Sequence, residues 1–362
     1  MTFYYYNNNK TIWLENKERK LTVEMSQKLS KCTYILNNCP NVRTYACVGG
    51  KKEGEGPMGE YFDKINNDPY FTTETFEKAE SEMQKQAILI ALRKCGLKPD
   101  DIDFMFGGDL LNQCVGTTYG IRDINIPFLG IYGACSTMAE GLLLSSLMID
   151  NNVGGNVLAA TSSHFCTAER QYRFPIEYGG QRTPTSQWTA TASGAVVVSN
   201  EDTAPYVRAV TIGTVQDMGV TDANNMGAAM APAAYETIKQ FLTDSGKKAS
   251  DFDKIVTGDL GKVGTRLLLK LLGDDGIDIS KQHNDCGLMI FDCDDQDVHA
   301  GGSGCGCAAS MLCGYFLPQL KSGALRNILF LATGALMSPT LSQQGESIPS
   351  IAHAVWLSHD KN

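Results

Sequence analysis

The sequence of 362 residues lacks features that would place it in a membrane or on nucleic acid. No apolar run approaches the roughly 18 to 20 residues that a membrane-spanning helix needs. The net charge is -9, whereas phosphate binding needs clustered Lys and Arg. No secretory signal opens the chain. We therefore expect a soluble protein that binds no nucleic acid.

The twelve cysteines lack the spacings of a metal site or a disulfide framework. There is no C-x-x-C pair, and the one tight pair is Cys305 and Cys307. His283 and His299 add no zinc-ligand pattern. Disulfide frameworks belong to small secreted domains rather than to chains of this length. We expect reduced, mostly buried thiols, no structural metal and no cofactor.

What the chain does contain is an internal repeat at an offset of 150 residues. Residues 81–110 and 231–260 align without a gap, and nine of the thirty positions are identical. Each copy has the pattern of an amphipathic helix ended by Gly, an acidic turn, a buried strand and then Gly-Asp-Leu. The identical pairs are Ile88 and Ile238, Leu92 and Leu242, Gly96 and Gly246, Lys98 and Lys248, Asp101 and Asp251, Asp103 and Asp253, Gly108 and Gly258, Asp109 and Asp259, and Leu110 and Leu260.

Each copy is followed by a helix with almost no charge. The first, Ser136–Ile149, carries only Glu140, and the second, Gly306–Gln319, carries no charged residue. Apolar strands are predicted after them, at residues 156–163 and 327–335. A helix that is apolar all round must be buried on all sides. The pattern therefore predicts an α/β fold with more layers than a doubly wound sheet.

The repeat also predicts the domain organisation. We expect a first half over residues 25–204 and a second half over residues 205–362. Residues 1–24 combine a Tyr/Asn tract with mixed charges and lack a periodic apolar face. They are expected to form a flexible N-terminal extension.

The duplicated halves and a Cys-headed central helix resemble the thiolase superfamily, which includes thiolases and ketoacyl-acyl-carrier-protein synthases. The stretches "GDLLNQ", "GACSTMAEG" and "HAGGSGCGC" carry the resemblance. It implies a thiolase-like five-layered α-β-α-β-α sandwich and a homodimer.

Longer stretches, such as "AATSSHFCTAERQYRFPIEYGGQ", resemble a sporulation branch of that superfamily. This resemblance implies binding of dipicolinic acid (pyridine-2,6-dicarboxylate) during its uptake into the developing spore. Calcium would enter only as part of the dipicolinate chelate. The implied partners are other stage V sporulation A proteins, which form a channel at the spore inner membrane, where this protein would be peripherally associated.

The enzymes of the superfamily use a Cys at a helix N-terminus, together with a His and an Asn or a second His. Cys135 matches the nucleophile position. The position of the first His falls at Gly258–Asp259, and the turn of the second partner offers Ser303, Cys305 or Cys307. We therefore expect a non-catalytic protein in which Cys135 lines a pocket. The alternative is an acyltransferase that uses Cys135 with a non-standard base, such as Asp259.

A small dianion favours helix N-termini and buried N–H groups. The turns at Cys135–Ser136 and at Gly304–Cys307 offer both, so these residues are candidate ligand-binding residues.

Three arginines, Arg170, Arg173 and Arg182, lie in a stretch expected to cover the pocket mouth. They could pair with the ligand carboxylates. The alternative is a solvated loop with ion pairs to Glu169 and Glu177.

The remaining candidates are His164, Asp109 and Asp259. The two aspartates occupy equivalent places at the carboxyl ends of strands, where open α/β sheets place their sites. They could supply oxygens to a bound calcium chelate, although two carboxylates alone cannot hold calcium tightly. Capping of the following turn is the alternative role for both.

Overall fold

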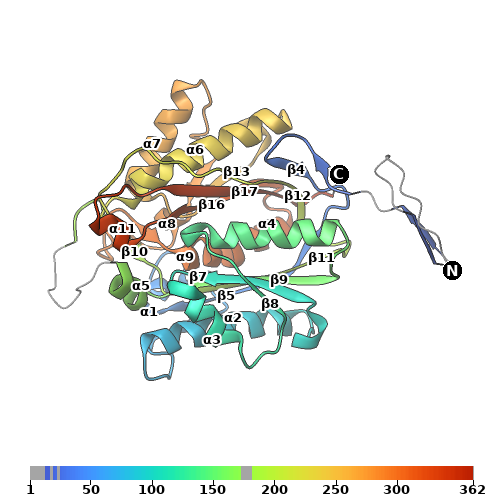
Figure 1. Ribbon diagram of the computed structural model, residues 1–362, viewed down its shortest axis with the longest axis horizontal. Coiled ribbons are helices and arrows are strands. Elements are labelled where there is room, and N and C mark those ends of the chain that lie inside the picture. Colours follow the sequence, from blue (N-terminus) through green and yellow to red (C-terminus); the bar gives the residue numbers. More distant parts are fainter. Residues whose placement is uncertain (1–12, 17–18, 23–24, 173–181, 362) are drawn as a thin grey trace.

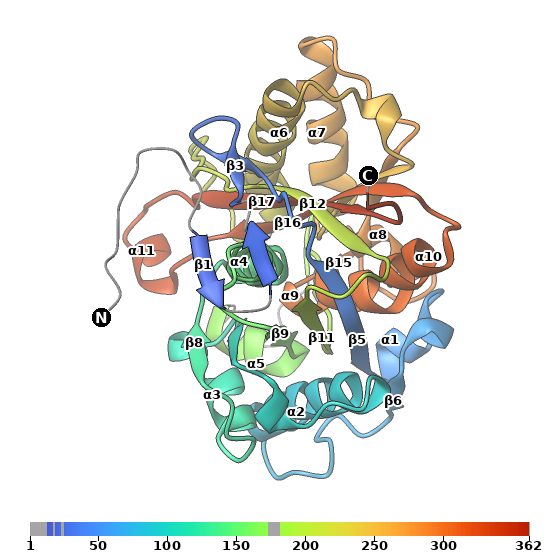
Figure 2. The same cartoon turned by 90° about the vertical axis from the view of Figure 1, so that its right-hand side faces the viewer.

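Helices and sheets alternate in five layers (Figure 1). The computed structural model describes all residues except 1–12, 17–18, 23–24, 173–181 and 362. The outer helix layers flank two sheets, and a central layer of helices lies between the sheets, where one helix is seen end-on in Figure 2. The outer helices are α2 (Phe76–Lys94) and α3 (Val115–Ile121) on one side and α6 (Met226–Ser245) and α7 (Gly261–Asp274) on the other.

The main path of each sheet is a block of five strands in the same order and with the same directions. The two blocks meet at one residue pair, Asn41 and Tyr206. In each block the first three strands are parallel and the last two are antiparallel to their neighbours. The first block is β8 (Phe128–Gly130), β7 (Phe104–Asp109), β9 (Asn156–Ser163), β11 (Ala192–Ser199) and β5 (Asn41–Gly50). The second is β14 (His283–Asp285), β13 (Lys254–Thr257), β16 (Asn327–Ala335), β17 (Ser350–Ser358) and β12 (Tyr206–Thr211).

Shorter elements complete the described chain. The strands β9 and β16 have the bounds expected from the sequence. The short strands are β3 (Gln27–Lys28), β4 (Thr33–Ile35), β6 (Lys64–Asn66), β10 (Trp188–Thr189) and β15 (Gly302–Ser303). Of these, β3, β4 and β6 pair beside the main paths of the sheets. The short helices are α1 (Lys51–Gly54), α5 (Phe165–Tyr172), α8 (Cys286–Met289) and α11 (Pro339–Gln343).

The N-terminal stretch that was expected to be a flexible extension contains two described strands. The strands β1 (Trp13–Asn16) and β2 (Arg19–Thr22) pair with each other and with no other described strand. The other positions of residues 1–24 lie outside the described residues.

One pair of repeated aspartates makes the same bonds in both halves. The carboxylates of Asp103 and Asp253 each accept two backbone N–H groups where the next strand begins. Asp103 does so from Gly155 and Asn156, at 2.7 and 2.9 Å, before β9. The Asp253 carboxylate accepts its two backbone N–H groups at 2.6 and 2.8 Å, at the start of β16. Each aspartate therefore ties the end of the repeat to the strand that follows the central helix.

The helix ends of the repeat also correspond. Gly96 and Gly246 have φ values of 72° and 66°, in the left-handed region that ends helices at glycine. Asp101 and Asp251 then accept the backbone N–H three residues before them, at 2.7 and 2.9 Å. These identical positions thus mark local structure that the fold uses twice.

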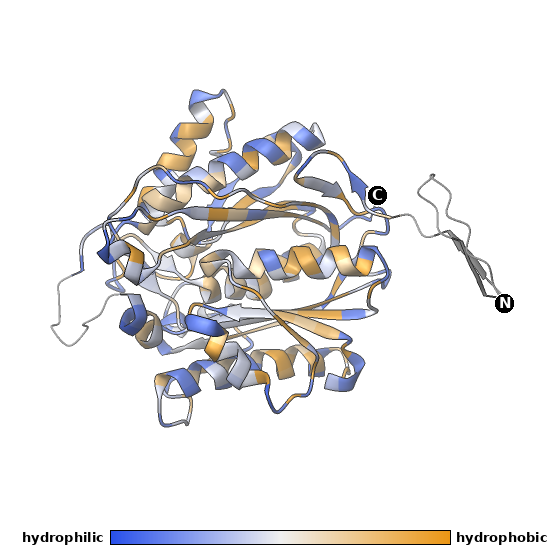
Figure 3. Ribbon diagram, in the orientation of Figure 1, coloured by the Kyte–Doolittle hydropathy of each residue, from blue (hydrophilic) through white to orange (hydrophobic). Residues whose placement is uncertain are grey.

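The two charge-poor helices lie between the sheets, as expected. The helix α4 (Thr137–Asp150) contacts strands of both sheets, and every residue of α9 (Cys305–Met311) is buried. Figure 3 shows apolar colour around α4, whereas the outer helices carry hydrophilic residues as well. The helix α9 continues through a π-helical turn, Leu312–Phe316, into α10 (Leu317–Ser322). Pro318 lacks an N–H, which accounts for the looser turn before it.

Small residues let α9 approach its sheet closely. A Cβ atom on Gly306 would lie 2.1 Å from the carbonyl oxygen of Ala192 on β11. A Cβ atom on Gly194 would lie 2.7 Å from the carbonyl oxygen of Ala309. Close packing of backbone on backbone therefore fixes where the helix begins.

None of the helices in the described part of the chain is long and apolar enough to cross a membrane.

Replacing Gly306 with alanine should lower the free energy of unfolding by about 1–3 kcal/mol, because the added methyl group overpacks rigid backbone. Gly273→Ala is the matched control. It lies in α7 with nothing within 4 Å of an added Cβ, so it should be neutral or stabilising by up to about 1 kcal/mol. Urea unfolding of both variants measures this. Equal unfolding midpoints for the two would contradict the packing argument.

Candidate functional site

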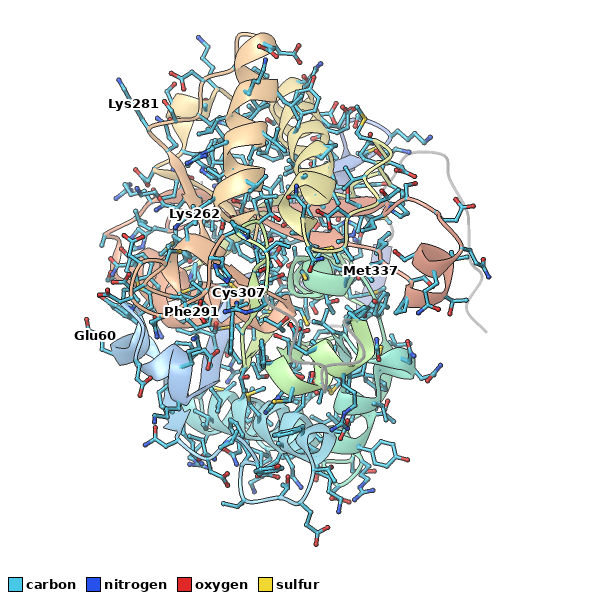
Figure 4. All side chains as sticks on the ribbon, turned by 90° about the vertical axis from the view of Figure 1, so that its left-hand side faces the viewer. Glu60, Lys262, Lys281, Phe291, Cys307 and Met337 are labelled. Atoms are coloured by element: carbon cyan, nitrogen blue, oxygen red, sulfur yellow. The ribbon has the colours of Figure 1, made fainter. Side chains whose placement is uncertain are left out.

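A cavity lies where the N-terminal ends of the central helices meet the carboxyl ends of the strands. Its volume is about 60 Å³, several times the roughly 10–15 Å³ that one water molecule needs. Both halves of the chain line it. The first half contributes Cys135 and residues of α5, and the second contributes Ser303 and three methionines. One of these, Met337, is labelled in Figure 4.

Cys135 lies in the 3₁₀ turn Ala134–Ser136 that leads into α4. The residue before it, Ala134, has a φ of 50°, which is rare for a residue other than glycine and marks a strained turn. The Cys135 Sγ lies 3.9 Å from the Oγ of Ser303. Burial, followed by the nearby charge of Asp259, raises the pKa of the Cys135 thiol well above its usual value. The thiol is therefore neutral at physiological pH.

Behind Ser303 lies the carboxylate of Asp259, which accepts three hydrogen bonds. The Ser303 hydroxyl and the Gly304 N–H both donate to Oδ2 at 2.9 Å, and the Thr333 hydroxyl donates to Oδ1 at 2.9 Å. Burial raises the pKa of Asp259 to about 6 in spite of these donors. A carboxylate thus occupies the region where the resemblance would place an imidazole.

The equivalent residue, Asp109, has a capping role. Its carboxylate accepts the Leu111 N–H at 2.9 Å and both the N–H and the hydroxyl of Thr117 at 2.7 Å. It does not line the cavity. Among the described residues there is also no group of three His, Cys, Asp or Glu side chains that could hold a metal ion. The carboxylates of Asp109 and Asp259 are therefore occupied by donors of the protein itself.

His164 points away from the cavity. Its Nε2 lies 2.9 Å from the carbonyl oxygen of Pro69, and its Nδ1 accepts the N–H of Cys166 at 3.2 Å. Burial lowers the pKa of His164, so the ring is neutral. None of the five histidines, all of which the structure describes, lines the cavity.

The other predicted residues form the shell behind the cavity. The Ser136 hydroxyl donates to the carbonyl oxygen of Gly133 at 2.7 Å. The Cys305 thiol donates to the carbonyl oxygen of Ser162 at 2.8 Å. The Cys307 thiol faces the carbonyl oxygen of Gly258 at 3.8 Å. Of the predicted ligand-binding residues that the structure describes, only Cys135 lines the cavity directly. The N–H of Gly304 donates to the Asp259 carboxylate.

Two of the three arginines lie in the described residues, and each has an acidic partner. Arg170 pairs with Glu77 at 2.6 Å. Arg182 pairs with Asp297 at 3.0 Å, and its guanidinium lies 4.8 Å from the ring centroid of Trp188. Arg173 and Glu177 lie outside the described residues. In the part of the chain that the structure describes, no arginine or lysine lines the cavity.

Sequence reasoning missed the wall that α5 supplies. The Tyr172 hydroxyl donates to the carbonyl oxygen of Leu110 at 2.5 Å and lies 2.9 Å from the hydroxyl of Tyr132. Buried Glu80 accepts the hydroxyl of Thr167 at 2.6 Å and so anchors the same helix from below. The stretch containing Tyr172 was expected to cover the pocket mouth, but no spacing singled out the tyrosine.

Comparison with known proteins decides the family. The sequence profile described as "Stage V sporulation protein AD (SpoVAD)" matches residues 30–358. Stage V sporulation protein AD of Bacillus subtilis (strain 168) is 44% identical over 325 residues, which are 90% of this chain and 96% of that protein. The chain belongs to the stage V sporulation protein AD family. This result confirms the sporulation branch suggested by the sequence.

Solved structures similar to this SpoVAD family member confirm the thiolase-like fold. One is 3-oxoacyl-[acyl-carrier-protein] synthase III from Aquifex aeolicus VF5, with a TM-score of 0.53 and 14% identity, covering 88% of this chain and 99% of that one. Another is OleA from Xanthomonas campestris with cerulenin bound, with a TM-score of 0.55 and 13% identity, covering 88% and 98%. At these identities the likeness concerns the fold alone.

Alkylation of Cys135 should show the neutral thiol directly. Its rate with iodoacetamide, followed by peptide mass spectrometry on the folded protein, should keep rising with pH up to at least about 9, because the thiolate is disfavoured by burial. An activated catalytic cysteine would instead reach a plateau near neutral pH. Such a plateau would contradict our description of the site.

Proposed function

We propose that this protein is a non-catalytic binding protein for dipicolinate and serves its uptake into the developing spore. The observation that carries the proposal is the cavity at Cys135, which keeps the thiolase-like architecture but has a carboxylate, Asp259, in place of an imidazole. Membership of a stage V sporulation family supplies the biological setting.

The lining of the cavity suits a small aromatic ligand. Met226, Met230 and Met337 form an apolar and adaptable wall, and thioether sulfur interacts favourably with aromatic rings. Ser303 and Thr189 add hydroxyl groups to the same lining for polar contacts. The N-terminus of α4 adds a partial positive charge near Cys135, which favours a carboxylate.

We further propose that the protein acts with other stage V sporulation A proteins at the spore inner membrane, as a peripherally associated homodimer. The edge strand β8 supports self-association. Leu129 on this strand is 51% exposed, and the nearby Tyr132 is 44% exposed, which is unusual for large apolar side chains at a sheet edge. Light scattering of the purified chain tests the dimer.

An acyltransferase remains the second candidate, because one observation favours it. The Cys135 thiol, the Ser303 hydroxyl and the Asp259 carboxylate form a connected chain, through which a proton could leave the thiol. This series of three groups contains no imidazole and no second side chain that could donate to an oxyanion. Loss of such groups costs several orders of magnitude in rate.

Acyl transfer is expected to be absent. Incubation with radiolabelled acyl-CoA should leave no stable thioester on Cys135, and condensation with malonyl or acetyl donors should not exceed that of Cys135→Ala, because the thiol has no effective base. Condensation that disappears in Cys135→Ala would establish the second candidate instead.

Calorimetry with dipicolinate, with and without calcium, tests the binding proposal. Cys135→Ser should keep most of the affinity, because the serine is neutral and close in size. Cys135→Asp should lose about 100-fold or more, because a third carboxylate beside the ligand is repulsive in a desolvated site. Equal and complete loss in both variants would show that the thiol makes a specific contact, and failure of the wild-type protein to bind would refute the proposal.

A further inference from the structure

We propose that Ser303 turns from a hydrogen-bond acceptor into a donor toward the cavity when Asp259 takes up a proton, so that binding of the ligand brings one proton into the site. The inference rests on the proposed function, because it assigns a proton to the binding of a dicarboxylate. It makes Asp259 a positioning residue, which acts on the ligand through Ser303.

In the ionised state of Asp259, the site presents the wrong polarity to a carboxylate. Ser303, Gly304 and Thr333 all donate to the Asp259 carboxylate, and the Cys135 thiol also interacts with it. Ser303 commits its one hydroxyl proton to Oδ2. The Ser303 oxygen then presents only its lone pairs to the cavity. A ligand carboxylate, which only accepts, would face an acceptor and a buried negative charge behind it.

Protonation of Asp259 reverses this arrangement without moving a heavy atom. The new proton on Oδ2 is donated to the Ser303 Oγ at 2.9 Å, and the serine proton is released toward the cavity. The N–H of Gly304 and the hydroxyl of Thr333 can still donate to the remaining lone pairs of the acid. The Cys135 thiol, 3.9 Å from the same Oγ, also faces a neutral acid instead of an anion.

Among the described residues around Asp259, no group supplies a positive charge that could balance the ligand. Cys135 before α4, Cys286 on α8, and Cys305 and Cys307 on α9 all feel the charge of Asp259. Burial raises the pKa of all four thiols well above the usual value, so they stay neutral.

The nearest other ionisable groups are also unsuited to balance a dianion. Asp285 on β14 accepts the N–H groups of Leu260 and Gly261 at 2.8 and 3.0 Å, and His283 lies beside it. Glu169, across the cavity on α5, is an acid as well. None of the cavity-lining residues in the described ranges is basic.

The direction of the pH dependence follows. Burial raises the pKa of Asp259 to about 6, so the acid is mostly ionised in the free protein at neutral pH. A dianion stabilises the protonated form, and binding therefore takes up a proton above about pH 6. Affinity should be constant below about pH 6 and should fall by about tenfold for each pH unit above it.

Calorimetry with dipicolinate in two buffers of different ionisation enthalpy, between about pH 5.5 and 8, tests the inference. Wild-type protein should take up close to one proton per ligand at about pH 7.5. Asp259→Asn should bind without net proton uptake and with a flat pH profile, since it carries no titrating group. Ser303→Ala should lose affinity at low pH, where the hydroxyl of the wild-type protein donates.

Thr333→Val gives a readout that a merely structural role would not move. It removes one donor to the ionised acid and leaves Ser303 in place, so the break in the affinity profile should move to higher pH. A flat profile for the wild-type protein, or an unchanged slope in Asp259→Asn, would overturn the inference while leaving dipicolinate binding intact. Absence of binding at every pH would instead refute the proposed function itself.

Discussion

The architecture depends on the burial of two helices between two sheets. Because α4 and α9 are apolar nearly all round, they cannot face water, and each sheet can cover only one side of them. Duplicating one unit provides the two sheets. The glycine contacts of α9 with β11 then hold that helix against backbone, which fixes the position of its N-terminus.

The cavity is a consequence of that constraint. The buried helices begin where the parallel strands end, so strand-end side chains and helix N-termini from both halves converge. In such a place a thiol can become a strong nucleophile if a base and oxyanion donors are near. Here burial and the charge of Asp259 raise the pKa of the Cys135 thiol and keep it protonated. Under the proposed function, the same geometry serves recognition of a small ligand.

Much of the fold could be predicted because its signals are local or repeated. The charge-poor helices and the strands at residues 156–163 and 327–335 follow from composition alone. Among the matched positions, Asp103 and Asp253 make bonds that recur in both halves. The sequence could not decide whether Asp109 binds ligand or caps a turn, because both roles need a carboxylate at a strand end. The structure shows the capping bonds.

The side chains of the cavity were harder to predict than its location. Cys135 was found from its place before a helix, but the choice among Ser303, Cys305 and Cys307 depended on the path of one turn. Likewise, the pairing of Arg170 with Glu77 joins residues that are distant in sequence. Periodicity and spacing do not encode such contacts, since they depend on how α5 packs against α2.

The central claim is that this cavity holds dipicolinate. A crystal structure of the protein with dipicolinate tests it most directly. Our account predicts electron density for the pyridine ring against Met226, Met230 and Met337, with one carboxylate within hydrogen-bond distance of the Ser303 hydroxyl. An empty cavity at saturating ligand, or density only at another place on the protein, would contradict the account.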